Sequence, residues 1–247
     1  MNGKRALVLI PCCKEKTANP SRVASIQALQ DMGNIRAKIL RLVQQTPQIA
    51  NRPENQRGIL DPNAPITLAA DLYTGNLYQA LGPVLRNAIA GGYPQVDILI
   101  VSALYGLIQL GEGIKEYELR IDDRLIAGAP VWRFWKREGL WRLLQAYVSE
   151  RNISYVWSLL PDSLPSYPYH QVFEDFWMLA ERQKTVVTLH VKVSKGDGRS
   201  AGTGSGAKRG EWLRDILNIN PHHLLGEPLP PAQLPTIPGY VFKYEPC

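Results

Sequence analysis

Short, nearly continuous apolar runs recur along the chain and predict buried strands. Three such runs cover residues 5–10, 96–101 and 153–160, and their branched residues are typical of strands covered on both faces of a parallel sheet. Residues 66–72 are a fourth strand candidate. Residues 185–193 alternate between apolar and polar positions, which predicts an exposed or edge strand.

Between these runs, apolar residues recur at helical spacing. Helices are predicted for residues 21–45, 76–90, 130–148 and 169–183, with a short one at 211–217. The proline-containing residues 46–65 predict a loop, and residues 102–123 show little periodicity, which is typical of a long functional loop.

This alternation of strands and helices predicts an α/β fold: a mostly parallel central sheet with helices on both faces, in a single domain. We expect the domain to span residues 1–220. The proline-rich residues 221–247 are expected to form a tail packed on that domain, with a short strand near residues 240–244.

Ligands of such sheets bind beyond the carboxyl ends of the strands. Four segments directly follow predicted strands: residues 11–16, 73–75, 102–107 and 160–162. We therefore expect these segments to meet at one edge of the sheet and to form the site.

Residues 11–16 read PCCKEK. The lysines and a following helix N-terminus favour thiolate over thiol, so Cys12 is a candidate nucleophile. Lys16 would lower its pKa or stabilise developing charge, and Pro11 and Cys13 would complete a ligand-binding turn. The alternative is that one cysteine simply packs in the core, because free cysteine is among the most buried residue types.

The second candidate segment is DLYTGNLY. Tyr73 and Thr74 offer hydroxyl groups to a ligand, and Gly75 allows the backbone to approach one closely. The alternative is an ordinary strand-to-helix turn in which Thr74 caps the helix.

The third candidate is the end of the central strand and the loop after it. Ser102 and Gly106 are placed to contact a ligand, Tyr105 or Asp122 to orient a base by hydrogen bonds, and Tyr117 to bind it. The alternative is a surface loop whose aspartates cap the next helix.

Two basic segments are candidates for contacts with nucleic acid. Arg133, Lys136 and Arg137 share a predicted helix with interleaved tryptophans, a combination that can grip a strand by charge and stacking. Lys208 and Arg209 end a glycine-rich stretch that runs into a helix N-terminus, a generic anion site. The alternatives are an amphipathic helix with its tryptophans inward, and a disordered linker.

The amino-acid composition limits which partners, cellular location and cofactors we expect. The formal net charge of +6 is compatible with a polyanionic partner. Three cysteines without spaced pairs indicate a reducing compartment, and neither a signal peptide nor a membrane-spanning run is recognisable, so we expect a cytoplasmic protein without a membrane partner. The glycine-rich stretch fits neither a phosphate-binding loop nor a dinucleotide fingerprint, and the four histidines lack metal-ligand spacing, so no cofactor or metal is expected. His170 could reach the site.

Taken together, the motifs resemble those of the YaaA-like superfamily. Its pattern is an LYxG turn, an SAxYGL strand end and a tyrosine shortly afterwards, matched here at residues 72–75, 102–107 and 117, with a late basic, glycine-containing element at residues 207–210. The PCCKEK turn is similar to the PCSxxK turn of the archaeosine synthase core domain, with Cys13 in the usual serine position.

The resemblance implies two roles. Resemblance to the YaaA-like proteins implies DNA binding in the peroxide stress response. Resemblance to the archaeosine synthase turn implies chemistry on the nitrile of a 7-deazaguanine base in DNA or RNA. Our leading hypothesis is a nucleic-acid-associated protein that holds a nucleobase at the carboxyl edge of the sheet. A base-modifying enzyme and a small-metabolite binder are the alternatives.

Overall fold

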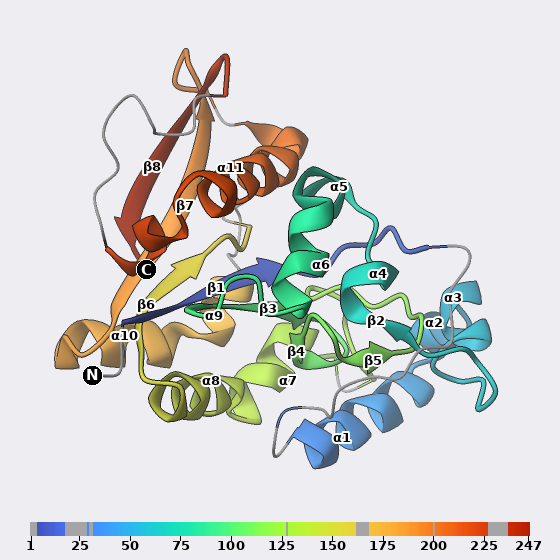
Figure 1. Cartoon of the computed structure of the whole chain (residues 1–247). Helices are drawn as coiled ribbons and strands as arrows, with labels where there is room; N and C mark the ends of the chain where they lie inside the picture. Colours follow the sequence, from blue (N-terminus) through green and yellow to red (C-terminus); the bar gives the residue numbers. More distant parts are fainter. Residues whose placement is uncertain are drawn as a thin grey trace.

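The structure is a computed structural model that describes residues 4–17, 29, 32–126, 128–161, 168–199, 201–226 and 237–247, apart from the side chain of Thr203. Its central feature is a sheet to which the described residues contribute six strands. These are β1 (Arg5–Pro11), β3 (Val96–Ser102), β4 (Gly106–Gln109), β6 (Ile153–Ser158), β7 (Val187–Lys195) and β8 (Tyr240–Pro246). They lie in the order β4-β3-β1-β6-β7-β8 (Figure 1).

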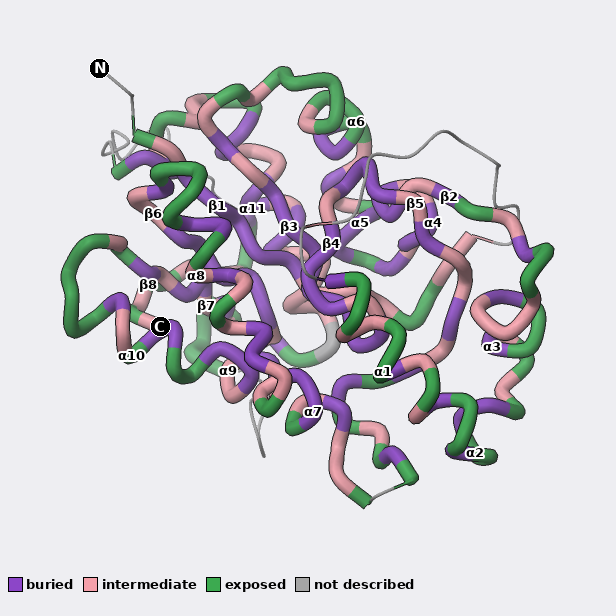
Figure 2. The backbone as a smooth tube through the Cα atoms, turned by 90° about the horizontal axis from the view of Figure 1, so that it is seen from below, coloured by how far each residue is buried: buried purple, intermediate pink, exposed green. Residues whose placement is uncertain are grey.

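The four inner strands are parallel, and the two edge strands are antiparallel to their neighbours. β1 pairs with β3 on one side and β6 on the other, and β6 pairs with β7, all in parallel. Residues 6–10 of β1 are fully buried, as Figure 2 shows along the middle of the molecule. The prediction of a mostly parallel α/β fold is therefore confirmed.

Helices cover both faces of the sheet. α5 (Asn76–Leu81), α6 (Pro83–Ile89) and α11 (Ser205–Ile219) lie on one face, and α7 (Val131–Arg137), α8 (Leu140–Glu150) and α10 (Glu174–Gln183) on the other (Figure 1). The remaining elements are α1 (Met32–Gln44), α2 (Pro47–Ala50), α3 (Pro53–Arg57), β2 (Thr67–Leu68), α4 (Ala69–Leu72), β5 (Gly113–Ile114), α9 (Pro168–Val172), η1 (Gly202–Gly204) and η2 (Pro221–Leu225). None of the helices within the described ranges is long and apolar enough to cross a membrane.

The strand predicted at residues 66–72 is wrong for most of its length. Only β2 is extended, and it pairs with β5 outside the main sheet. The backbone then turns into α4, because Ala69 and Ala70 favour a helix and their N–H groups bond the carbonyls of Glu112 and Leu110. Residues 73–75 consequently follow a helix and not a strand.

The two long loops contain regular structure that their composition did not reveal. Residues 102–123 include β4 and β5, and residues 46–65 include α2 and α3. The short helices each begin at a proline, where the fixed φ suits the first helical turn. β4 folds back on β3 through Gly106, whose φ of 70° lies in the left-handed region that favours glycine.

Other boundaries differ from the prediction. Glycines divide two of the expected helices, at Gly82 between α5 and α6 and at Gly139 between α7 and α8, and the helix expected at residues 169–183 is divided into α9 and α10. β7 is an inner strand because β8 covers its outer side, so the expected edge position was wrong. α11 begins at Ser205, within the glycine-rich stretch.

Two expectations extend beyond what the structure describes. α1 accounts for the second half of the helix predicted at residues 21–45, and residues 21–28, 30 and 31 lie outside the described residues. The boundary between a domain of residues 1–220 and a tail stays a prediction, although β8 of that tail belongs to the central sheet.

Helix α1 is tied to the turn between β3 and β4 by the half-buried cation of Arg36. The Arg36 guanidinium donates to the carbonyls of Tyr105 at 2.8 Å and Leu107 at 2.9 Å, and it pairs with the carboxylate of Glu112. The Glu112 side chain is only 3% exposed. This ion pair therefore holds the backbone of the SALYGL motif in place.

Replacing Arg36 by methionine is expected to lower the free energy of unfolding by about 3–5 kcal/mol, because the Glu112 carboxylate stays buried without its cation. Urea unfolding followed by circular dichroism measures this difference. Lys38→Met on the same helix is the control: Lys38 pairs with Glu138 while 57% exposed, and its loss is expected to cost about 1 kcal/mol or less. Equal losses for the two variants would contradict the structural role of Arg36.

Candidate functional site

The turn of residues 11–16 leaves the sheet between the ends of β3 and β6. The Cys12 N–H still bonds the carbonyl of Val101 on β3, at 2.9 Å. Lys16 then forms an antiparallel bridge with Tyr73, and the Thr74 N–H donates to the carbonyl of Glu15. The structure thus brings the first two predicted segments side by side.

Lys16 holds this turn closed. Its ammonium group donates to the carbonyls of Cys13 and Lys14, each at 3.1 Å, and lies 4.5 Å from the ring centre of Tyr117. Burial lowers the pKa of Lys16 from its ordinary value, because the charged form loses water. Two carbonyls and an aromatic face replace that water, so Lys16 orders the backbone of the turn.

Cys13 is locked into the turn by its sulfur. Its Sγ donates to the carbonyl of Glu15 at 3.0 Å and accepts the Gly75 N–H at 3.2 Å. Burial raises the pKa of the thiol to about 11, although Lys16 acts in the opposite direction. Lys16 thus favours the thiolate as expected, but burial outweighs it, and the Cys13 thiol stays protonated near neutral pH.

Gly75 is required here by space. A Cβ at this position would lie 2.8 Å from the Cβ of Cys13 and 3.0 Å from its sulfur. The φ of Gly75 is −64°, which other residues adopt readily, so only the close approach demands glycine. Gly75 is also the N-cap residue of α5, the place that the alternative assigned to Thr74.

A chain of buried hydroxyl groups lies behind the turn. Ser102 Oγ is 2.7 Å from the hydroxyl of Tyr117, which is 2.8 Å from that of Tyr73. Ser102 Oγ also accepts the N–H groups of Leu104 and Tyr105, which occupy its two lone pairs. Its hydrogen is therefore donated to Tyr117, and Tyr117 donates in turn to Tyr73. Burial raises the pKa of both phenols well above their ordinary value, so they remain neutral.

Tyr105 supports this chain from outside the cavity described next. Its hydroxyl donates to the carbonyl of Lys115 and accepts the N–H of the same residue, and its ring packs edge-on against Tyr117 at 5.4 Å. Burial raises the pKa of Tyr105, so its hydroxyl stays protonated. Gly106 lies against Trp135, with no room for a Cβ. The backbone contacts of Tyr105 leave it in a supporting position and not in the expected position beside a base.

A cavity of about 270 Å³ opens in front of the turn, and we call it the cysteine cavity. Its walls are Cys12, Cys13, Lys14 and Lys16 of the turn, residues 118–122, and residues 161, 168 and 169. The sulfur of Cys12 lies 3.5 Å from the hydroxyl of Tyr169, on α9. Pro11, Thr74 and the chain of hydroxyl groups, all predicted to belong to the site, do not line this cavity. The Pro11 carbonyl instead accepts a hydrogen bond from the hydroxyl of Tyr78.

Residues 10–225 match the sequence profile of the family described as peroxide stress protein YaaA. The chain belongs to this family. The match spans the cysteine cavity and most of the sheet, so the resemblance inferred from the short motifs is confirmed over nearly the whole chain.

Two similar proteins carry the name UPF0246 protein. One, from Streptococcus uberis, is 26% identical over 215 residues, which cover 84% of this chain and 82% of the relative. The other, from Porphyromonas gingivalis, is 33% identical over 141 residues, covering 56% of this chain and 50% of the relative.

The basic residues predicted to contact phosphate lie away from this cavity and are mostly paired. Lys136 pairs with Glu174, Arg137 with Glu138 and Lys208 with Glu211, whereas Arg133 is exposed beside the ring of Trp132. Trp135 is fully buried and donates to the carbonyl of Ala103, as the amphipathic alternative requires.

Arg209 does not have the exposed position that was predicted for a residue in contact with nucleic acid. It is 2% exposed, and its Nε donates to the carbonyl of Val191 on β7. Its guanidinium fastens α11 to the sheet, so it does not face a polyanion.

Some residues of the cavity wall were not singled out by the sequence reasoning. Tyr169 follows β6 at the carboxyl edge, so the rule that selected residues 160–162 and His170 could have found it; Asp162 lies outside the described residues. Glu118 and Arg120 belong to the long loop but carry no local pattern. Asp122 does line the cavity, paired with Arg120 at 2.9 Å, while neighbouring Asp123 pairs with Arg52. Within the described ranges, no group of three or more histidine, cysteine or carboxylate side chains is suited to a metal ion.

Cys13 is expected to alkylate slowly and with a steep pH dependence. With a thiol pKa of about 11, the reactive thiolate increases about tenfold for each pH unit between pH 7 and 9.5 without a plateau. Iodoacetamide labelling of the Cys12→Ser variant, followed by peptide mass spectrometry, measures this rate. A plateau below pH 9 would show that the thiol is not desolvated as described.

Gly75→Ala is expected to lower the free energy of unfolding by about 1–3 kcal/mol, because the new methyl group overlaps the side chain of Cys13. Gly33→Ala in α1 is the matched control, since its Cβ would meet nothing within 4 Å. Thermal or urea unfolding compares the two. A neutral Gly75→Ala would contradict the tight contact between the two segments.

Proposed function

We propose that this protein binds nucleic acid and holds one of its bases in the cysteine cavity. Because the YaaA family is named for the peroxide stress response, we place this binding within that response. The observation that carries the proposal is a small, partly apolar cavity whose mouth bears exposed cations.

The size and walls of the cavity suit a planar heterocycle. Ligand pockets typically measure roughly 300–1,000 Å³, so a cavity of about 270 Å³ lies just below this range and suits a single base better than a whole nucleotide. Leu119, Ile121 and Pro168 provide apolar surface for ring faces. The Tyr169 hydroxyl and the Glu118 carboxylate offer hydrogen bonds to the polar edge of a base.

The charges at the mouth suit the phosphates that accompany a base. Lys14 and Arg120 have side chains that are 74% and 65% exposed, and each has an acidic neighbour, Glu118 at 3.6 Å and Asp122 at 2.9 Å. Such exposed pairs contribute little stability, so phosphate can replace the carboxylates at small cost. The carboxylates of Glu118 and Asp122 also make binding selective, because they repel a phosphate group that does not lie beside Lys14 or Arg120.

The test measures binding of a labelled single-stranded DNA oligonucleotide by fluorescence anisotropy between 50 and 200 mM salt. Affinity is expected to fall with salt, because phosphate contacts release counterions. Lys14→Ala and Arg120→Ala should each weaken binding and reduce the slope of log K against log salt by about 0.7, the loss of one phosphate contact. Arg86→Ala is the matched control: Arg86 is 76% exposed and paired with Asp71, but it lies on α6.

A second arm compares the same oligonucleotide with one whose bases are removed at the central positions. Tighter binding of the intact strand is expected, because base contacts add to the phosphate contacts. Affinity that does not change with salt would overturn the proposal of nucleic acid binding. Equal affinity for the two strands would overturn the proposal that a base enters the cavity.

A further inference from the structure

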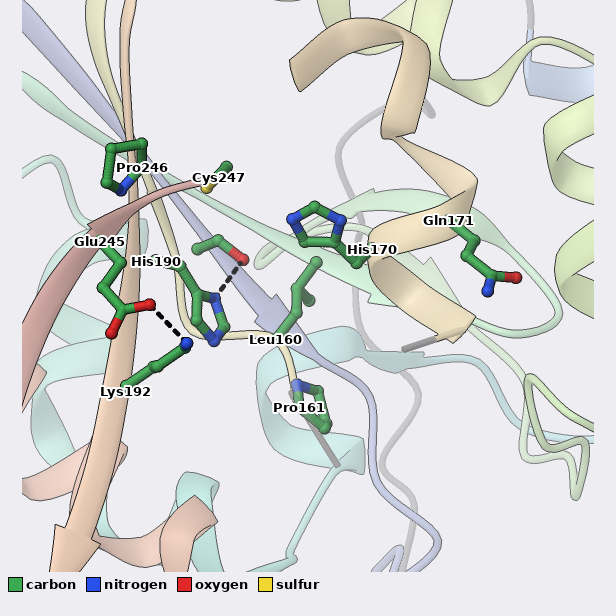
Figure 3. A pocket seen from close by; sticks show the side chains of 10 residues that line it. Leu160, Pro161, His170, Gln171, His190, Lys192, Glu245, Pro246 and Cys247 are labelled. Atoms are coloured by element: carbon green, nitrogen blue, oxygen red, sulfur yellow. Dashed lines mark hydrogen bonds and ion pairs between the residues drawn. The ribbon is translucent and has the colours of Figure 1, made fainter. Parts of the chain in front are cut away.

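A separate cavity, of about 500 Å³, opens where helix α1, helix α7 and the segment before α7 meet, and we call it the arginine cavity. It shares no wall residue with the cysteine cavity. It also differs from a cavity of about 330 Å³ at the ends of β6 and β7, where Figure 3 shows Lys192 paired with Glu245 across the wall. The charges of the arginine cavity are not balanced in this way.

The interior of the arginine cavity is apolar. Leu125 and Phe134 are only 4% and 3% exposed, so they form its deepest part. Leu42 of α1 and Ala129 are half-buried and lie nearer the surface. A volume of about 500 Å³ is within the range of roughly 300–1,000 Å³ that is typical of sites for small molecules. The apolar part of such a molecule therefore fits inside.

Three cations of α7 line the same cavity. Lys136 is paired with Glu174, whereas Arg133 and Arg137 are exposed. The two arginines are four residues apart, which places their Cβ atoms about 5–6 Å from each other on one face of the helix, and like charges at this spacing destabilise a helix. Each guanidinium lies over an aromatic ring, at 5.2 Å and 5.8 Å from the ring centre. A carboxylate between the two arginines would remove their repulsion and accept hydrogen bonds from both.

The carboxylates around the cavity do not neutralise these cations. Glu138 is shared by two of them, Lys38 of α1 at 2.7 Å and Arg137 at 3.5 Å. Arg133 has no carboxylate partner within the part of the chain that the structure describes. Among these residues, positive charge therefore exceeds negative charge at the mouth, and an anionic group is favoured there over a neutral or positive one.

A strand of nucleic acid suits this cavity less well, although the same arginines were predicted to contact phosphate. Bases stack on exposed aromatic faces, whereas Phe134 and Trp135 of α7 are buried. Trp132 is half-buried and does not line the cavity. An aliphatic chain needs no stacking partner, and it gains from contact with apolar walls alone.

We propose that the arginine cavity binds a small amphiphilic carboxylate, with the carboxylate between Arg133 and Arg137 and the aliphatic chain in the apolar interior. A medium-chain fatty acid has this chemistry. The planar fork of each guanidinium matches the two oxygens of a carboxylate. This site is independent of the base-binding function proposed for the cysteine cavity.

The experiment titrates the full-length chain with hexanoate, octanoate and decanoate by calorimetry near neutral pH. Each methylene group removed from water is worth about fourfold in affinity, so binding is expected to tighten by this factor per methylene until the cavity is full. Octanamide and octylammonium carry the same chain with a neutral or a positive head group. Both are expected to bind more weakly than octanoate, and octylammonium the most weakly.

Variants separate the charged mouth from the apolar interior. Arg133→Gln and Arg137→Gln should each weaken octanoate binding about threefold and leave octanamide binding nearly unchanged, because they remove only charge. Ala129→Phe should weaken both probes, since the ring takes up part of the cavity. Arg142→Gln is the matched control: Arg142 is exposed on α8, 5.0 Å from the ring centre of Trp141, but it does not line the cavity.

Affinity that rises with chain length and falls in the arginine variants for octanoate alone supports the proposal. Affinity that is independent of chain length, equal for octanoate and octylammonium, or unchanged in both arginine variants overturns it. Absence of octanoate binding also overturns it. If Arg133→Gln then weakens binding of the labelled single-stranded oligonucleotide, the arginines of α7 belong to a nucleic acid surface instead.

Discussion

The backbone hydrogen bonds of strand β1 are the constraint on which the site depends. Residues 6–10 are fully buried, so each of their peptide groups must find a partner within the protein. β3 and β6 supply these partners from both sides, and the pairing continues past the end of the strand: Cys12 bonds Val101, and the Leu159 N–H bonds the carbonyl of Leu9. The turn at residues 11–16 has to emerge between two neighbouring strand ends, where a parallel sheet leaves room for a ligand.

The sequence allowed this central arrangement to be predicted because the relevant signals are local. β1, β3 and β6 are short apolar runs that end at a proline, a serine and a serine, and the rule for parallel sheets then places their ends together. The same reasoning failed at residues 66–72, where the apolar run belongs to a helix held by the carbonyls of Leu110 and Glu112. Those partners lie some 40 residues away along the chain, and no local pattern reports them.

Side-chain roles were harder to predict than strand ends. Arg209 sits in a basic, glycine-containing element that looks suited to phosphate, yet its side chain is buried and its Nε donates to the carbonyl of Val191 on β7. Tyr73, Tyr117 and Ser102 do gather, as expected. They form a supporting layer behind the turn, however, and not the wall of the cavity that was expected of them. In both cases the residue type was informative, and the direction in which the side chain points depended on tertiary contacts.

Helix α9 lies between the cysteine cavity and a neighbouring cavity of about 330 Å³ at the ends of β6 and β7. Its adjacent residues Tyr169 and His170 belong to different cavities, and Pro161 lines both. Because one short helix contributes to both walls, any displacement of α9 would change the shape of both cavities. If an occupant of one cavity changes the affinity of the other, then an occupant of the second cavity changes the affinity of the first by the same factor.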